Sequence, residues 1–154
     1  MTLLNTSIIL YYEIKKSLKF DNKGFYCIYN CTMKPEQKLY HLFKKNCPKI
    51  LITRLELYSA PGVSDLLLYN KLNGFSLLEL KIQTANKIKF SPHQILFHTT
   101  RNKRNYILVQ TASASRSTVK LYSSKSIEGL TLDPRATTPL AVDDWPQIQK
   151  ILIS

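Results

Sequence analysis

Hydrophobic and polar positions alternate with two different periods along the chain, and each change of period marks a predicted element. From residue 33 onward, apolar residues first recur at helical spacing, with Leu39, Leu42 and Phe43 on one face. Strand-like alternation follows, and a second helix opens at Ser91, a residue type suited to the N-cap, with Pro92 at the first helical position. The predicted elements are a helix over 33–46, strands over 49–58, 63–69 and 75–82, a helix from 91, a strand over 105–111, a further strand over 118–124 and a closing helix over 143–154.

The order of these elements predicts a mixed sheet. The second and third strands are joined by the turn-rich NKLNG and form a hairpin, whereas a helix separates the third strand from the fourth. Since parallel strands need such a crossover, we expect the third and fourth strands to be parallel. The predicted fold is α/β (an α+β mixed sheet), with an αβββαβ core and an added C-terminal strand and helix.

Residues 1–32 show no clear period. They combine a short apolar run, a basic stretch and the aromatic FYCIYN. We expect 1–32 to be an N-terminal appendage and 33–154 to be a single domain, large enough to bury a core of its own. The apolar run from Ile8 to Tyr12 is too short to span a membrane.

Two carboxylates interrupt the apolar hairpin. If Tyr69 pairs with Phe75 across a loop from 70 to 74, Asp65 falls opposite Glu79, and Lys81 shares the face of Glu79. Opposed side chains have Cβ atoms about 4.5–5.5 Å apart, where like charges repel. A divalent cation between the carboxylates would remove the repulsion, and Mg²⁺ prefers such oxygen ligands. The pattern therefore indicates metal-assisted phosphodiester hydrolysis, with Lys81 in reach of the water or the phosphate.

A structural interpretation of the same residues is also open. Asp65 and Glu79 could lie at exposed sheet edges, with Lys81 as a surface partner of one of them. An Asp followed by Glu-x-Lys is short and common by chance, so the spacing alone does not separate the two interpretations.

The chain is strongly basic, with 22 Lys and Arg against 10 Asp and Glu and a net charge of +12 over 154 residues. This charge favours a polyanionic partner, nucleic acid before an anionic membrane surface, although it can also serve solubility alone. No acid occurs between Glu79 and Glu128, so we expect that interval to face phosphates. The residues expected to bind DNA are Lys87, Lys89, His93, Arg101, Lys103 and Arg104.

The chain contains the motifs Gly62-Val63-Ser64-Asp65, Glu79-Leu80-Lys81 and Ser91-Pro92-His93-Gln94. Together they resemble the PD-(D/E)XK nucleases, and most closely the virus-type replication–repair nuclease (VRR-NUC) branch, whose pattern is G-x-P-D, E-x-K and S-x-x-Q. Pro35-Glu36 and Arg54-x-Glu56 are also similar to that branch. The resemblance covers about residues 33–111, and Ser64 stands where the family usually has proline.

The resemblance implies a restriction-endonuclease-like fold with a metal site. Asp65 and Glu79 would bind Mg²⁺, for which Mn²⁺ would substitute. The Leu80 backbone carbonyl would complete the ligands, and Glu36 would reach the metal through water. Lys81 would orient or activate the attacking water. Gln94 would support the site from the following helix, and no organic cofactor is implied.

These observations predict a Mg²⁺-dependent DNA endonuclease. By resemblance it would be structure-selective, like Holliday-junction resolvases, and act as a homodimer on branched DNA in phage or repair DNA processing. The alternatives are a restriction-like, flap or homing nuclease on linear DNA, and a catalytically silent DNA-binding module of the same fold. An odd count of 3 cysteines favours a reducing compartment, so the expected location is the cytoplasm, the host's if the protein is viral.

Overall fold

The chain divides into two units, Met1–Met33 and Lys34–Ser154, a division that falls next to the predicted boundary after residue 32. The computed structural model describes residues 20–21, 24–25, 33–55, 61–111 and 117–154. In the first unit, the described strands β1 (Phe20–Asp21) and β2 (Gly24–Phe25) pair antiparallel.

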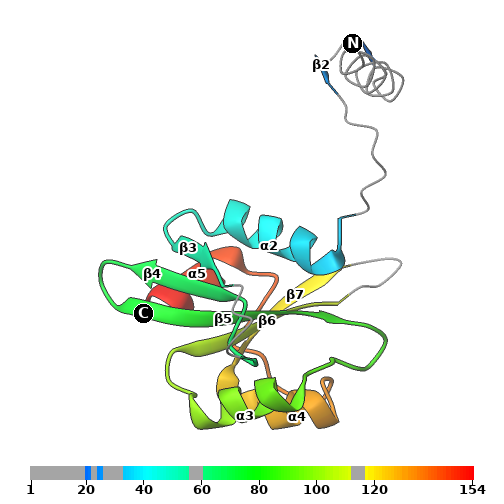
Figure 1. Ribbon diagram of the computed structural model, residues 1–154, viewed down its shortest axis with the longest axis vertical. Coiled ribbons are helices and arrows are strands. Elements are labelled where there is room, and N and C mark those ends of the chain that lie inside the picture. Colours follow the sequence, from blue (N-terminus) through cyan, green and yellow to red (C-terminus); the bar gives the residue numbers. More distant parts are fainter. Residues whose placement is uncertain (1–19, 22–23, 26–32, 56–60, 112–116) are drawn as a thin grey trace, which may run out of the picture. The chain divides into compact units, whose positions relative to one another are not determined.

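The second unit is built on a six-stranded mixed sheet with the order β3-β4-β5-β6-β7-β8 (Figure 1). Its elements are α2 (Pro35–Asn46), β3 (Leu51–Arg54), β4 (Leu66–Asn70), β5 (Gly74–Gln83), α3 (Pro92–Thr100), β6 (Asn105–Thr111), β7 (Thr118–Ser123), the 3₁₀ turn η1 (Ser124–Ser126), α4 (Ile127–Leu132), β8 (Ala141–Val142) and α5 (Trp145–Ile153). Strands β5 and β6 are parallel and the other neighbours are antiparallel. The predicted α/β class with an αβββαβ core is confirmed, and the arrangement is consistent with a restriction-endonuclease-like fold.

Helices cover both faces of this sheet, as Figure 1 shows. On one face, α2 and α5 pack over a core that includes Leu39, Phe43 and Leu78, all fully buried. On the other face, a second cluster joins residues of β6 and β7 to α4, with Ile107 and Leu130 fully buried. Because alternate residues of β5 point to opposite faces, Leu78 and Leu80 enter the first core, whereas Glu79 and Lys81 point toward α3.

The register of the β4–β5 hairpin is the one predicted. Tyr69 pairs with Phe75, and the ladder runs back to Leu66 opposite Leu78. Asn70 and Gly74 also pair, so the loop comprises residues 71–73 and is shorter than predicted. The ladder ends one pair before Asp65, which lies in a bend at the entrance to β4, where the prediction had placed a strand from residue 63.

Several boundaries differ from the predictions. Strand β3 ends at Arg54, and residues 56–58 of the predicted 49–58 strand lie outside the described residues. The short elements α4, η1 and β8 were not predicted, whereas α5 begins after the N-cap Asp144, within the closing helix predicted over 143–154. Over the described residues, none of the helices has the length and apolar character needed to cross a membrane.

Candidate functional site

Glu79 is a fully buried acid in the middle of β5. Its Oε1 accepts a hydrogen bond from Gln94 Nε2 at 2.5 Å and forms an ion pair with Lys81 Nζ at 2.9 Å. The side chain of Lys81 is itself only 13% exposed. The structural interpretation requires Glu79 to lie at an exposed sheet edge. The buried position of Glu79 contradicts that requirement.

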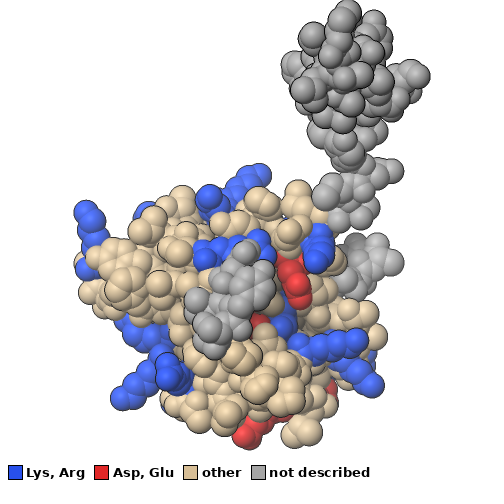
Figure 2. Space-filling view, in the orientation of Figure 1, with Lys and Arg blue, Asp and Glu red and all other residues tan. Residues whose placement is uncertain are grey.

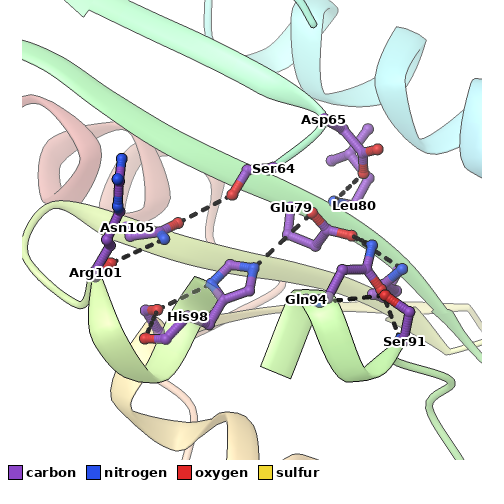
Figure 3. A network of polar contacts seen from close by, with 11 residues as sticks. Ser64, Asp65, Glu79, Leu80, Ser91, Gln94, His98, Arg101 and Asn105 are labelled. Carbon is purple, nitrogen blue, oxygen red and sulfur yellow. Dashed lines mark hydrogen bonds and ion pairs between the residues drawn. The ribbon is translucent and has the colours of Figure 1, made fainter. Parts of the chain in front are cut away.

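The first turn of α3 holds Gln94 in place. Ser91 Oγ accepts from the Gln94 backbone N–H at 3.2 Å, and Gln94 Oε1 accepts from the Ser91 N–H at 3.0 Å. This capping box uses the Gln94 oxygen and leaves its amide nitrogen to donate to Glu79 (Figure 3). The Ser-x-x-Gln motif is therefore both a helix start and a support for the buried carboxylate.

Asp65 approaches β5 from the entrance to β4. Its Oδ2 accepts from the Leu80 backbone N–H at 2.8 Å, and its own carbonyl accepts from the Leu55 N–H at 2.8 Å. Burial, followed by the charge of Glu79, raises the pKa of Asp65 from 3.8 to about 6, although the Leu80 bond and Lys81 oppose the shift. The N–H and C=O of one strand residue point to the same side, so the Leu80 carbonyl also points toward the Asp65 segment.

Glu36 and Arg54 lie near Asp65 from α2 and β3. Together with Asp65 and Tyr40 they line a small cavity of about 40 Å³. The charge of Glu36 adds a further, smaller rise to the pKa of Asp65, and the Arg54 guanidinium carbon lies 5.8 Å from the Tyr40 ring centroid. Glu56, which the motif resemblance also includes, lies outside the described residues.

The donors around Asp65 and Glu79 fit a hard divalent cation. Asp65, whose pKa is raised by burial and by the charge of Glu79, gains from a positive charge shared with Glu79, and Mg²⁺ prefers carboxylate and carbonyl oxygens. Glu79 Oε2 is buried and has no hydrogen-bond partner among the described residues. In that same part of the chain, no three His, Cys, Asp or Glu side chains form a metal-binding group. The donors that the resemblance implies are Asp65, Glu79 and the Leu80 carbonyl, and Glu36 lines the cavity beside Asp65.

His98 is a buried neighbour of the site that the sequence did not reveal. Ser124 Oγ donates to the His98 carbonyl at 2.9 Å and lies 2.9 Å from His98 Nδ1. Ser124 therefore contacts both the backbone and the ring of His98, and His98 Nε2 faces Glu79 Oε2 at 3.9 Å. Ser124 follows His98 by 26 positions, and no local motif links the two.

Gly62 and Ser64 explain the shape of the segment before Asp65. Gly62 has a φ of +90°, and a Cβ there would lie 2.4 Å from the His93 carbonyl oxygen. Ser64 is fully buried and its Oγ donates to Asn105 Oδ1 at 3.2 Å. A side-chain bond to the start of β6 thus holds the position where the similar family has proline.

The expected DNA-binding residues separate into two groups. Lys87 and Lys89 line a groove of about 540 Å³ together with Lys34, Glu36 and Lys81. Figure 2 shows a small acidic patch flanked by Lys and Arg side chains. The groove therefore places cations beside the candidate catalytic lysine, and Lys34 is a member that was not predicted.

The second basic group lies in the connection between α3 and β6, at the opposite end of β5. Arg101 and Lys103 are exposed, and the Arg104 carbonyl accepts from the Leu77 N–H at 2.9 Å. His93 is exposed in the first turn of α3. The structure therefore does not gather all six predicted residues into one patch.

Comparisons with protein-family models, with curated proteins and with solved structures give no match. The functional argument accordingly rests on the residues and on the geometry of the site.

Proposed function

We propose that this chain is a metal-dependent DNA endonuclease of the PD-(D/E)XK type, with Asp65, Glu79 and Lys81 at its centre. The observation that carries the proposal is the convergence of the two acids and the lysine around the end of the β4–β5 ladder. Burial and Glu79 raise the pKa of Asp65 to about 6, and Lys81 Nζ lies 2.9 Å from Glu79. Placing two carboxylates close together in a partly buried position costs folding free energy, and such clusters of perturbed ionisable groups are typical of functional sites.

The side chains of the site would have different roles in phosphodiester hydrolysis. Asp65, Glu79 and the Leu80 carbonyl would hold Mg²⁺, or Mn²⁺ in its place. The chemistry that the ion supplies when bound is Lewis-acid polarisation of a phosphoryl oxygen. Lys81 would donate a hydrogen bond to the phosphate or orient the attacking water. The water oxygen bonds to phosphorus as the bond to the leaving oxygen breaks, one water proton passes to solvent, and the leaving oxygen takes up a proton from solvent.

Gln94 would be a positioning residue, which orients the Glu79 carboxylate. Its amide fixes Glu79 and is fixed in turn by the helix cap, so it would preserve the angle at which the carboxylate meets a cation. Glu36 would act through water from the rim of the groove.

The basic groove beside Lys81 supports nucleic acid as the substrate. Four lysines line it, and phosphate contacts of this kind position a backbone without reading sequence. Selectivity for branched DNA, a homodimeric state, a role in phage or repair DNA processing and a cytoplasmic location stay predictions.

The test is cleavage by the intact protein of a four-way junction, a flap, a single strand and a plain duplex, with and without Mg²⁺. Asp65→Asn and Glu79→Gln should abolish cleavage of every substrate and leave DNA binding intact or tighter, because each change removes a charge that repels phosphate. Glu128→Gln, an equal charge change on α4, should cleave normally. Normal turnover by Asp65→Asn would remove the site assignment.

The same set of DNA substrates distinguishes the nuclease from the second candidate function, a catalytically silent DNA-binding module. That candidate requires binding without Mg²⁺-dependent cleavage of any substrate by the unaltered protein. The set of two acids and a lysine favours the enzyme, since a module that only binds DNA gains nothing from one buried and one half-buried carboxylate side by side.

A further inference from the structure

An exposed aromatic pair lies on the same sheet face as Glu79 and Lys81. Tyr69 on β4 and Phe75 on β5 are direct cross-strand partners, and their ring centroids are 5.0 Å apart. Phe75 is 62% exposed and Tyr69 is 36% exposed. Because side chains alternate along a strand, Phe75 shares the face of Glu79, roughly 13 Å away along β5.

The pair belongs to a larger apolar surface at the hairpin end of the sheet. Leu51 of β3, the partner of Tyr69, is 66% exposed, and Leu72 in the hairpin loop is 84% exposed. Beside them lies a hollow of about 440 Å³, whose lining includes Lys49, Leu51 and Tyr69. Exposed apolar surface of this kind marks an interaction site more often than an accident of packing.

The charged side chains that line the hollow or adjoin the aromatic pair are positive. Lys49 and Lys71 line the hollow, and Arg104 Nε donates to the Phe75 carbonyl at 3.0 Å. The segments that carry the apolar residues, 49–54 and 66–78, contain no Asp or Glu, and the next acid along β5, Glu79, is paired with Lys81. A polyanion matches this pattern. A second copy of the chain does not, because a two-fold contact would set the same lysines against each other.

We infer that Tyr69 and Phe75 form a stacking platform for unpaired nucleobases, with Lys71 and Arg104 attracting the adjoining phosphates. In a duplex the faces of the bases are covered by their neighbours, so this platform engages only single-stranded or unpaired segments. The inference rests on the proposed function for its substrate and makes it more specific. The substrate is DNA with an unpaired segment roughly 13 Å from the bond that is cut.

The test measures equilibrium binding by fluorescence anisotropy in EDTA, with a labelled oligo(dT) and a duplex of equal length. Phe75→Ala should weaken single-strand binding on the order of 5- to 100-fold, the range found when one stacked base is lost, and change duplex binding less than about twofold. Phe75→Leu keeps an apolar side chain and should weaken binding similarly. Phe75→Trp should bind well and show tryptophan quenching on single-strand addition.

Leu132→Ala is the matched control, because Leu132 is exposed and apolar, has no aromatic face and lies on α4, outside the apolar surface at the hairpin end. It should bind both nucleic acids like the unaltered protein. The inference fails if Phe75→Ala changes both affinities equally or neither, or if Phe75→Leu binds like the unaltered protein. It also fails if sedimentation shows that Phe75→Ala dissociates a dimer while single-strand binding is kept, since the surface would then be a self-interface.

Because the binding assay contains no metal, it separates this inference from the proposed function. Loss of single-strand binding in Phe75→Ala without any cleavage by the unaltered protein would support the platform and reject the nuclease. Cleavage that depends on Asp65 but binding that ignores Phe75 would reject the platform alone.

Discussion

At the scale of single residues, the site is organised by the contrast between its two acids. Glu79 is fully buried but has Lys81 and Gln94 on one oxygen, so its charge is compensated. Asp65 has one backbone donor, and burial together with Glu79 raises its pKa. Asp65 has fewer groups that stabilise its negative charge, so its ionisation depends on whether a cation is present.

The first prediction concerns the pH dependence of metal affinity. The pKa of Asp65 is raised from 3.8 to about 6, so its carboxyl is protonated below that value and must lose the proton to bind a cation. Mn²⁺ affinity should be nearly constant above pH 7 and fall by about tenfold per pH unit below 6. Calorimetric titrations at pH 5, 6 and 7.5 measure it.

The metal-free protein should show the opposite trend in stability. A raised carboxyl pKa contributes stability below the unfolded value, and that contribution is lost as pH rises through about 6. Asp65→Asn should remove this loss and the pH step in Mn²⁺ affinity together. Equal Mn²⁺ affinity at pH 5 and pH 7.5 in the unaltered protein would contradict the assignment of Asp65 as a ligand.

The sequence reveals those site residues whose placement follows from their own strand, and it does not reveal those whose contacts come from distant parts of the chain. Asp65, Glu79 and Lys81 were predicted from strand alternation, and the observed register agrees. His98 could not be predicted, because Ser124, whose side chain lies within hydrogen-bond distance of its ring, comes from a turn far along the chain. A lone histidine in a helix has no sequence signature that distinguishes a buried position facing an acid from an exposed one.

At the scale of elements, the contact between the Gly62 segment and α3 sets the site's geometry. The Gly62 Cα lies against the His93–Gln94 peptide, so the entrance to β4 and the start of α3 are mutually positioned by backbone. Asp65 follows the glycine by three residues, and Gln94 forms part of the contacted peptide. The close contact between Gly62 and the start of α3 therefore positions both Asp65 and Gln94.

The second prediction compares two glycines with positive φ. Gly74→Ala, at φ +73° with open space around it, should cost about 1 kcal/mol of unfolding free energy through its backbone conformation. Gly62→Ala, at φ +90° and against His93, should cost a further 1–3 kcal/mol or so, because the helix start must move. Urea denaturation measures both, and cleavage should fall more in Gly62→Ala. Equal costs would show that the close approach does not constrain the site.

Elements with strong local signals were predicted, and those without them were not. The cap at Ser91 and the crossover from β5 to β6 follow from capping chemistry and connection length. Helix α4 has only six residues, too few to show a helical period, and β8 has two. Both depend on tertiary packing, since Ile127 and Leu130 join the second core and Ala141 pairs with Leu121.

At the scale of the whole molecule, the cores lie within the second unit. The first core begins at Leu39 and ends at Leu152, and the second lies between Ile88 and Leu130. Both clusters draw on residues from one unit, which also contains Asp65 and Glu79. The site and the packing that supports it therefore belong to the same compact part of the chain.

The last prediction is that this unit folds and acts without the first. A protein comprising residues 33–154 keeps both hydrophobic clusters, all six strands of the main sheet, and the proposed metal donors. Its urea midpoint should match that of the full chain, and its Mg²⁺-dependent cleavage should stay within about threefold, a difference below 1 kcal/mol in transition-state free energy. The full chain carrying Asp65→Asn serves as the inactive reference. A soluble fragment that has lost cleavage would show that residues 1–32 contribute to the substrate surface, and an insoluble one that they complete the fold.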